Sequence, residues 1–399
     1  MFNEFIAYGL ILFLFLSLVF RSRYSKIPIW ALMAFATFIT IVTGLVNVEE
    51  LSTVIDFEVI FFLIGMFSIV ALADTSGLLD ALAVWFISKF KTRYSAIIGS
   101  AFLFGILAAF TVNDTVALMG PPIAYSIAKI LRVDPRMMFL LLAFSLTIGS
   151  VMTPIGNPQN VLIAIESGIK APFIEFIKWL AIPTMLNIYV TSLYLIKAFK
   201  ISNGDISIQL IPWEKITCKR DAILGAIGLI IVPAILLIND IMFVLNLPHI
   251  EHIGFIPFIV AAALYVASSE PRKILGRVDW GTIVFFISMF IVVDGIWRTG
   301  VIQGLLKPLS ISPVQSIIQN TTYITIASII FSQVISNVPF TKFYISYMKL
   351  QGFSPVDTIE WIDLAMSTTI AGNLTLLGAA SNIIVVETLE SRYNYTISF

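Results

Sequence analysis

A succession of apolar stretches is the feature that most limits what this chain can fold into. A helix of about 20 mostly apolar residues crosses the hydrocarbon core of a bilayer. We predict spanning segments at 5–20, 27–46, 57–74, 137–166, 172–197, 221–243, 254–268, 279–297 and 358–388. Two more stretches, 94–131 and 314–350, have apolar arms on either side of a polar tip, and they form either pairs of full helices or re-entrant hairpins. The pattern predicts an all-α polytopic membrane protein.

The composition argues against the other broad classes. Hydrophobic residues make up 58% of the chain and charged residues 12%, whereas an ordinary soluble domain carries about 25% charged residues. A soluble chain so poor in charge would expose large apolar patches, which leaves little room for a water-soluble enzyme. Basic and acidic residues number 24 each, so no net charge favours nucleic acid as a partner. The single cysteine, Cys218, rules out an internal disulfide and a cysteine-based zinc or iron–sulfur site.

The basic residues of the connecting loops predict the orientation in the membrane. With spans that alternate in direction, 18 of the 24 Lys and Arg residues lie on one side. The other side holds Lys170, Lys178, Arg298, Lys307, Lys342 and Lys349. The positive-inside rule makes the first side cytoplasmic. We expect a multi-pass protein of the plasma or inner membrane, with its N-terminus outside and its 201–220 loop in the cytoplasm.

The two halves of the chain resemble each other. When the second half is aligned with the first at a constant offset in residue number, Asp56-Phe57 matches Asp279-Trp280. At the same offset, Asn113-Asp114-Thr115 matches Ser336-Asn337-Val338. After a slip of one residue, Thr153, Gly156 and Asn160 match Thr375, Gly378 and Asn382. Five spans, an odd number, separate equivalent points, so the two repeats lie in opposite orientations. Inverted repeats around a site at the membrane midplane are typical of secondary transporters.

Two polar constellations lie in the first half. Asn113-Asp114-Thr115 occupies a hairpin tip, where a membrane-depth aspartate usually faces a functional cavity; a capped turn near the interface is the alternative. In the run 153–160, two prolines and Gly156 break the helix. Unwound backbone at this depth must line a cavity or be buried in protein. The half-helix that begins near Gln159 directs its positive end at the break, as at an anion site. A purely structural kink would not need Asn157, Gln159 and Asn160.

The second half has two matching constellations. Ser336-Asn337-Val338-Pro339 is the other hairpin tip, and Lys342 lies just beyond it. The Lys342 ammonium either meets an anionic solute, stands in for a coupling cation, or snorkels to the surface. The run 372–382 is a break without proline, in which glycines, small residues and amides replace the prolines.

These four motifs resemble the ion transporter superfamily, which includes arsenite permeases, citrate-transporter-like permeases and divalent anion/sodium symporters. Asn113-Asp114 is similar to the arsenite permease hairpin, and 336–340 is similar to the melanosomal P-protein branch. Ser336-Asn337 matches the start of the symporters' Ser-Asn-Thr motif, but Val338 replaces its threonine, and Asp114 replaces the asparagine of their first tip. The resemblance implies re-entrant hairpins, elevator-type alternating access and, in many members, a homodimer.

The resemblance also implies a scaffold part and a moving transport part in each repeat. The first repeat spans 1–200, with scaffold helices 5–93 and transport elements 94–197. A cytoplasmic linker at 201–220 leads to the second repeat at 221–399, with scaffold helices 221–310 and transport elements 311–390. The chain ends shortly after Asn382, at Phe399. We therefore expect the last helix of the second repeat to be missing, through truncation or because a partner supplies it.

The function expected from the sequence is ion- or proton-coupled secondary transport of a small anionic or oxyanion solute across the lipid bilayer. The residues expected to bind solute or ion are Asn113, Asp114, Thr115, Thr153, Gly156, Asn157, Gln159, Asn160, Ser336, Asn337, Val338, Lys342, Thr375, Gly378, Ser381 and Asn382. A coupling sodium ion would lie among Asn113, Asp114, Gly156, Asn160, Asn337, Gly378 and Asn382. No other cofactor is expected. A sodium/proton antiporter is the alternative, and a membrane-embedded enzyme or receptor is the remote one, since no catalytic motif and no soluble domain is evident.

Overall fold

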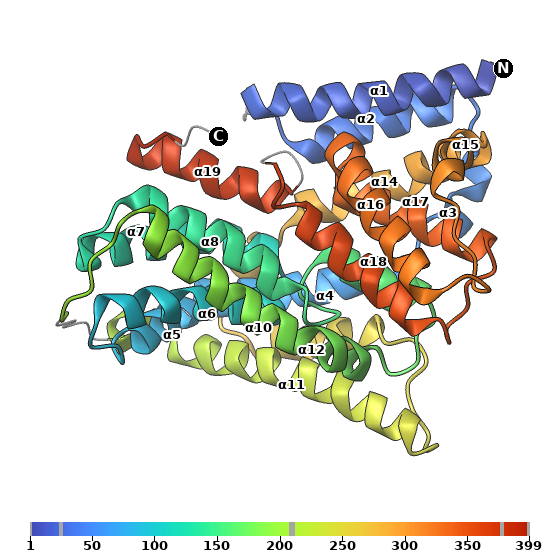
Figure 1. The fold of residues 1–399 in the computed structure, drawn as a ribbon. Coiled ribbons are helices and arrows are strands. Elements are labelled where there is room, and N and C mark those ends of the chain that lie inside the picture. Colours follow the sequence, from blue (N-terminus) through green and yellow to red (C-terminus); the bar gives the residue numbers. More distant parts are fainter. Residues whose placement is uncertain (1, 24–26, 207–211, 376–378, 397–399) are drawn as a thin grey trace. The chain divides into compact units, whose positions relative to one another are not determined.

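The computed structural model describes residues 2–23, 27–206, 212–375 and 379–396, and every regular element within them is helical (Figure 1). The longer helices are α1 Phe2–Arg23, α2 Ile29–Val42, α4 Phe57–Thr75, α5 Leu78–Ile87, α6 Arg93–Thr111, α7 Asn113–Leu131, α8 Pro135–Ser150, α9 Pro158–Glu166, α10 Pro172–Ala198, α11 Lys219–Val244, α12 Phe255–Ala267, α14 Trp280–Arg298, α16 Ile317–Ile335, α17 Asn337–Leu350, α18 Thr358–Ala371 and α19 Ala380–Tyr393. The shorter ones are η1 Val48–Glu50, α3 Leu51–Val54, η2 Pro212–Lys215, α13 Pro271–Leu275, α15 Val301–Leu306 and η3 Lys307–Leu309. For the described residues, the all-α prediction is confirmed.

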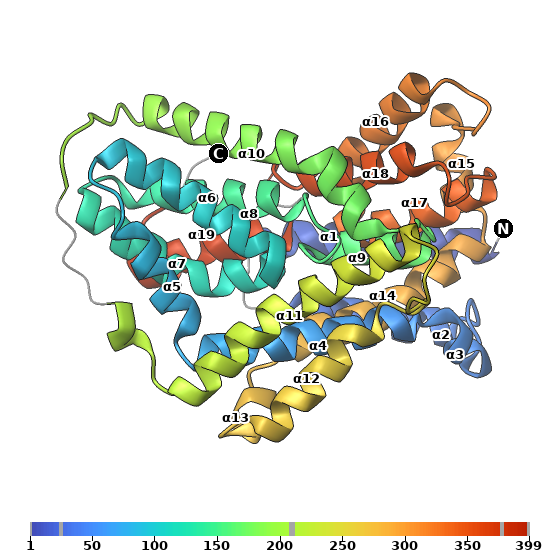
Figure 2. The same cartoon turned by 90° about the horizontal axis from the view of Figure 1, so that it is seen from below.

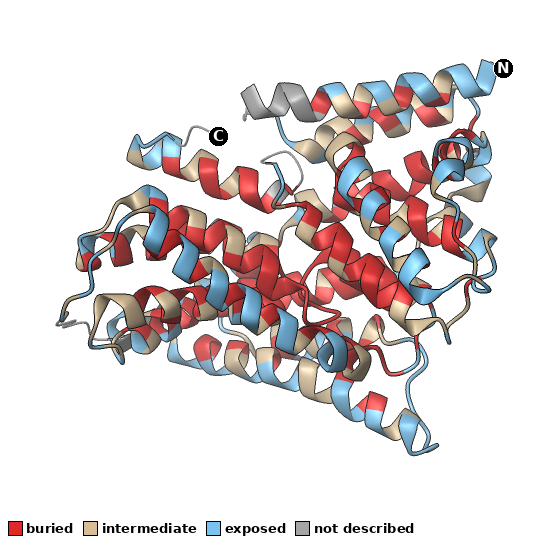
Figure 3. Cartoon of the chain, in the orientation of Figure 1, coloured by how far each residue is buried: buried red, intermediate tan, exposed pale blue. Residues whose placement is uncertain are grey.

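Several helices have the length and surface of membrane spans. Among the described residues, α4, α6, α10, α11 and α14 are long and apolar enough to cross a bilayer. Only 33% of the apolar windows of α10 and of α11 is buried, and Figure 3 shows exposed residues along both helices. The outward side chains include Ile182 and Ile230, which are 79% and 69% exposed. Large isoleucine-rich outer faces suit lipid rather than water, so the chain is a multi-pass membrane protein.

The two segments in which the sequence predicts a break, 137–166 and 358–388, are both interrupted. Segment 137–166 forms α8 and α9, with irregular backbone at 151–157 between them. The break follows from Pro154 and Pro158, which lack the amide proton that a continuing helix needs. Segment 358–388 forms α18 and α19, and part of its break, residues 376–378, lies outside the described residues.

Both polar-tipped stretches are helical hairpins that turn at a single residue with positive φ. Val112 (φ 68°) joins α6 to α7, and Ser336 (φ 69°) joins α16 to α17. The next residue is asparagine in both hairpins, so Asn113 corresponds to Asn337. The match between the two repeats in the sequence pairs Asp114 with Asn337, so at the hairpin tips this pairing is wrong by one residue. The second half therefore has one extra residue between the start of α14 and its hairpin tip. The starts of α4 and α14 still correspond as the sequence predicts, at Phe57 and Trp280.

The chain divides into two compact units, each assembled from segments that are distant in sequence. Unit 1 comprises Met1–Leu63, Pro158–Lys170 and Asp279–Ala379, and unit 2 comprises Ile64–Asn157, Ala171–Val278 and Ala380–Phe399. Each broken helix therefore contributes one half to each unit. The α9 helix packs against α17 and α18 in unit 1, whereas α19 packs against α7 and α8 in unit 2.

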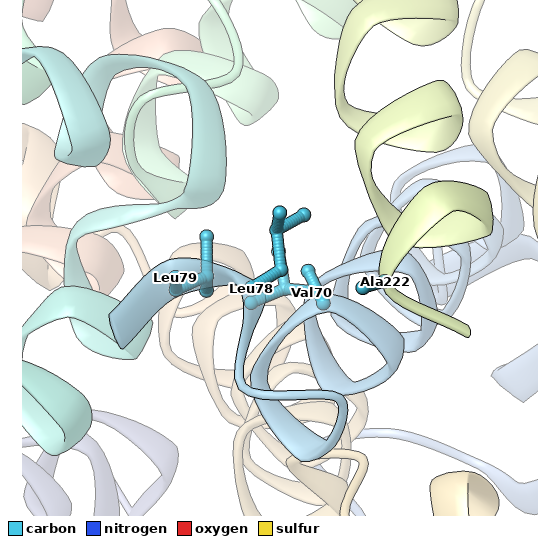
Figure 4. Close-up of a cluster of buried hydrophobic side chains, with 5 residues drawn as sticks. Val70, Leu78, Leu79 and Ala222 are labelled. Atoms are coloured by element: carbon cyan, nitrogen blue, oxygen red, sulfur yellow. The ribbon is translucent and has the colours of Figure 1, made fainter. Parts of the chain in front are cut away.

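Close helix contacts and apolar side chains hold unit 2 together. The α6 and α8 helices cross at two glycines, where a Cβ on Gly149 would lie 2.2 Å from the Cα of Gly105. A second apolar cluster joins α4, α5 and α11 through Val70, Ala73, Leu78, Leu79 and Ala222 (Figure 4). Burial of such side chains contributes about 25 cal/mol per Å² of apolar surface removed from solvent.

A carboxylate of α11 fixes the start of α10 in unit 2. Asp240 is 3% exposed, and its Oδ2 accepts hydrogen bonds from the backbone amides of Phe173 (2.6 Å) and Ile174 (3.1 Å). The first amides of a helix have no partner within the helix, and a carboxylate also interacts favourably with the positive end of its dipole. Asp240 therefore fixes the position of α10 through α11.

Candidate functional site

In unit 2, the first hairpin tip is joined to the first helix break. The amide of Asn113 donates a 2.8 Å hydrogen bond to the carbonyl oxygen of Gly156. The Asn113 side chain is 4% exposed, and among the described residues its Oδ1 has no hydrogen-bond partner. A non-glycine residue at positive φ, such as Val112, costs about 1–3 kcal/mol. The hairpin therefore accepts a strained turn and a buried carbonyl acceptor directly beside unwound backbone, an arrangement suited to ligand binding.

The first break itself is held by side-chain contacts. The Thr153 hydroxyl donates to the carbonyl oxygen of Ala109, and Asn157 Nδ2 donates to the backbone carbonyl (3.3 Å) and Oγ (3.1 Å) of Ser150. A Cβ on Gly156 would lie 2.1 Å from the Ser150 carbonyl oxygen, so the backbone passes too closely for any side chain there. Of the residues predicted in this break, Thr153, Gly156 and Asn157 make contacts that shape it.

The α19 helix carries two further candidate residues into unit 2. Asn382 is 3% exposed, and its Oδ1 accepts a 3.3 Å hydrogen bond from the hydroxyl of Thr147 on α8. Ser381 is 1% exposed, and its Oγ has no hydrogen-bond partner within the part of the chain that the structure describes. Unit 2 thus contains eight of the predicted residues: Asn113, Asp114, Thr115, Thr153, Gly156, Asn157, Ser381 and Asn382.

In unit 1, the second hairpin tip makes contacts of its own. Asn337 Oδ1 accepts a hydrogen bond from the amide of Val338 (3.0 Å) and another from the Ser336 hydroxyl (3.4 Å). Ser336 and Asn337 are each 6% exposed, and Val338 is half-buried. The tip therefore places neutral polar groups in a nearly closed environment, where each hydrogen bond is stronger than it would be in water.

Gln333, which the sequence did not single out, connects this tip to the second break. Its Nε2 donates to the carbonyl oxygen of Ala371 (2.8 Å), and its Oε1 accepts from the hydroxyl of Thr375 (2.5 Å). The carbonyl oxygen of Ala371 lies at the end of α18, where it also accepts a 3.1 Å hydrogen bond from the amide of Leu374. Thr375 is exposed in unit 1, and the predicted residue Gly378 lies outside the described residues.

The α9 helix supplies two buried amide side chains to unit 1. Gln159 is 1% exposed and Asn160 is fully buried. No described residue forms a hydrogen bond with the Nε2 of Gln159. A buried donor left unsatisfied costs about 1–3 kcal/mol, so a ligand that accepts a hydrogen bond there would recover that energy.

Lys342 is held in an ion pair rather than standing alone. Its Nζ lies 2.6 Å from both carboxylate oxygens of Glu166, and the two side chains are 18% and 8% exposed. The ammonium also lies 5.2 Å from the centroid of the Phe290 ring. The pair joins α17 to the C-terminal end of α9 within unit 1. Lys342 is one of the binding residues predicted from the sequence, whereas its partner Glu166 is not.

The candidate residues form a neutral, oxygen-rich set. Among the described ones, Asp114 and Lys342 are the charged members. No group of three or more His, Cys, Asp or Glu side chains with metal-ligand proximity occurs in the described part of the chain. Amides, hydroxyls and unwound backbone suit hydrated or oxygen-liganded ions and solutes with oxygen atoms.

Long apolar helices, together with a break between α8 and α9 that contains the buried polar residues Thr153 and Asn157, are typical of a polytopic membrane protein of the solute-transporter class. Comparison with known proteins identifies the family. The chain belongs to the citrate transporter family, whose model matches residues 10–371. It is a membrane transporter, and the resemblance to the ion transporter superfamily is confirmed.

Individual relatives agree with this assignment. An uncharacterized transporter of Mycobacterium tuberculosis is 26% identical over 356 residues, which cover 87% of this chain and 81% of the relative. The inner membrane protein YbiR of Escherichia coli is 25% identical over 341 residues, covering 85% and 81%. The human P protein is 23% identical over 425 residues, covering 86% of this chain and 51% of the relative.

Proposed function

We propose that the chain is an ion- or proton-coupled secondary transporter of a small anionic or oxyanion solute, with citrate as the first solute to test. The proposal rests on the repeated arrangement in which a hairpin tip lies beside a helix break, once in each unit. Such breaks expose backbone groups and helix ends that bind ions and carboxylates in transporters. The family match to citrate transporters supports a carboxylate as solute.

The charge of the candidate residues supports coupling to a cation. Lys342 is the cationic residue among the described candidates, and Glu166 already neutralises it at 2.6 Å. A multiply charged anion in unit 1 would therefore meet amides, hydroxyls and the N-terminal end of α9 rather than a free positive charge. Burial of such an anion is costly without a counter-charge, so a sodium ion or a proton should enter with it. Asp114 is the candidate that would carry this charge.

The transport cycle that we propose is of the elevator type, with the two repeats inverted in the membrane and the hairpins re-entrant. The internal repeat is supported by matching helix starts, at Phe57 and Trp280 and again at Asn113 and Asn337. A homodimer and an external N-terminus belong to the same proposal. A sodium/proton antiporter uses the same class of residues without the organic anion, and it is the competing outcome of the test.

The test is capacitive current from the purified protein in liposomes on a solid-supported membrane. Citrate, succinate, arsenite and sodium are applied in turn to the wild type, Asp114→Asn and Asn382→Ala. The control is Glu270→Gln, which alters an exposed carboxylate paired with Lys273. We expect an anion-dependent current that both site variants reduce at least tenfold and the control leaves intact. A response to sodium alone would favour the antiporter, and normal currents in both site variants would refute the site.

A further inference from the structure

A row of buried polar contacts follows the interface between α16 and α18 within unit 1. The two helices lie side by side (Figure 2) and run in the same direction, because contacting residues are 38 to 40 positions apart all along them. The contacting pairs are Asn320–Glu360, Thr325–Asp363, Ser328–Ser367 and Gln333–Ala371. We call this row the α16–α18 seam. It begins near the N-terminal ends of both helices and ends beside the second hairpin tip.

Asp363 occupies the middle of the seam without a cationic partner. It is 9% exposed, and the Thr325 hydroxyl lies 3.4 Å from each of its carboxylate oxygens. One hydroxyl proton serves both oxygens, and in the described part of the chain neither Lys nor Arg pairs with this carboxylate. An isolated buried carboxylate is strongly disfavoured unless it binds a proton or another cation. The environment of Asp363 therefore suits a group that exchanges a proton.

Glu360 provides a second carboxyl group one helical turn away from Asp363, at the end of the seam that lies near the N-terminal ends of α16 and α18. It is 6% exposed and accepts a 3.3 Å hydrogen bond from Asn320 Nδ2. The same amide also donates to the carbonyl oxygen of Ser312, which is half-buried in the loop before α16. Glu360 thus lies between the loop before α16 and Asp363, in position to pass protons from that loop to Asp363.

Hydroxyl groups continue the seam from Asp363 toward the hairpin tip. Ser367 donates a 2.8 Å hydrogen bond to Ser328, and both are nearly or fully buried. One turn further along α16, the fully buried Ser332 hydroxyl has no hydrogen-bond partner in the described ranges, and Ser336 of the tip follows after another turn. Hydroxyls both donate and accept, so they can relay a proton.

The groups that interact with Asp363 in the described part of the chain are a hydroxyl, a carboxyl group and a phenol. They belong to Thr325 of α16, Glu360 of α18 and Tyr344 of α17. The Tyr344 hydroxyl is fully buried and has no hydrogen-bond partner among the described residues. The ammonium of Lys342 on α17 is paired with Glu166. Hydroxyl and amide contacts would be enough to pack α16 against α18, whereas two buried carboxyl groups carry a desolvation cost. Their presence at this interface therefore points to a role beyond packing.

We propose that the α16–α18 seam is the proton pathway of this transporter and that Asp363 is the residue that binds the coupling proton. On loading, a proton that enters past Glu360 forms an O–H bond with the Asp363 carboxylate and neutralises its negative charge. On release, that bond breaks and the proton leaves along the hydroxyls toward the tip, so one positive charge moves per cycle. The inference rests on the proposed coupled transport. It takes the coupling ion to be a proton and assigns it to Asp363 instead of Asp114, which stays a residue of the solute site at the first hairpin tip.

The first experiment tests proton binding without any transported solute. Infrared difference spectra are recorded on the full-length protein in lipid as the pH is lowered, and the C=O band of newly protonated carboxyl groups is measured. We expect Asp363→Asn to remove one component of this band and Asp363→Glu to shift it. The control Asp294→Asn, which alters a carboxylate paired with Arg298 at 2.6 Å, should leave that component unchanged. A component that persists unshifted in both Asp363 variants overturns the proposal.

The second experiment separates proton coupling from solute binding in proteoliposomes. For Asp363→Asn we expect citrate accumulation driven by a pH gradient to fall at least tenfold, whereas exchange of radiolabelled citrate at equal concentrations continues. Ser328→Ala should slow the accumulation but keep the infrared component. If Asp363→Asn still accumulates citrate with the pH gradient, the proton pathway is refuted. If even the wild type does not exchange citrate, the proposed solute is wrong, and the infrared result alone decides the role of Asp363.

Discussion

The ion pair between Glu166 and Lys342 should stabilise unit 1 by a measurable amount. The two side chains are 8% and 18% exposed, and both carboxylate oxygens lie 2.6 Å from Nζ. Removing one partner of a buried pair leaves an uncompensated charge and costs about 3–5 kcal/mol. Since Lys342 keeps some solvent contact, we expect Lys342→Met to lower the free energy of unfolding by about 3 kcal/mol, at the lower end of that range.

The two single variants should not be equivalent. Glu166→Gln leaves the ammonium 5.2 Å from the Phe290 ring centroid, and a desolvated cation–π contact contributes about 2 kcal/mol. We expect this variant to lose only about 2 kcal/mol. The double variant should be more stable than the sum of the two losses predicts, with a coupling energy of about 2 kcal/mol.

Denaturant titration of the detergent-solubilised protein, followed by tryptophan fluorescence, measures these free energies. The matched control is a cycle on Glu270 and Lys273, whose side chains are 59% and 60% exposed and form an ion pair at 2.8 Å. An exposed pair should couple by less than about 1 kcal/mol and weaken in high salt. If the Glu166–Lys342 cycle is additive, or no larger than the control, the pair does not stabilise the fold and our reasoning is refuted.

Three further predictions follow from local contacts. Gly156→Ala places a Cβ 2.1 Å from the Ser150 carbonyl oxygen, so thermal unfolding should show a loss of about 1–3 kcal/mol; an unchanged melting temperature would contradict the close approach. Asp240→Ala removes the cap of α10 and should cost about 1.5–3 kcal/mol, with Asp240→Asn intermediate; a loss no larger than that of an exposed carboxylate variant would exclude the cap. The hydrogen bond from Arg298 lowers the pKa of Glu50 below 4.5, so its stabilising effect is present above pH 4.5 and is lost as the pH falls through the lowered pKa. Glu50→Gln should abolish this part of the acid sensitivity, and an unchanged profile of stability against pH would exclude it.

Features that depend on neighbouring residues in the sequence were predictable. The spans agree closely with the observed helices because length and hydropathy are local properties, as for the predicted 57–74 and the observed Phe57–Thr75. The first break was visible because Pro154, Gly156 and Pro158 disrupt a helix wherever they occur. The hairpin tips were visible for the same reason, as short polar runs between apolar arms.

Features that depend on distant partners were not predictable from the sequence. Glu166 is the last residue of its helix and resembles an ordinary interfacial carboxylate until its partner, 176 residues away, is known. Gln333 and Asp363 are two polar residues among several on their helices, and their partners also lie on other segments. The one-residue error in the repeat alignment has a similar origin, since the insertion lies outside the compared motifs and only the turn geometry identifies Asn113 with Asn337.

The exchange of half-helices between the units has a consequence for biosynthesis. The α9 helix packs against α17 and α18, which the ribosome adds much later, as the 176-residue separation of Glu166 and Lys342 illustrates. Likewise, Thr147 of α8 can form its hydrogen bond to Asn382 only after the chain has grown by a further 235 residues. Neither unit can close before translation is almost complete, and closing such long loops is slow. The nascent protein therefore passes through a stage in which α9 has been synthesised but its final neighbours have not, and this is the stage at which assistance during insertion would matter most.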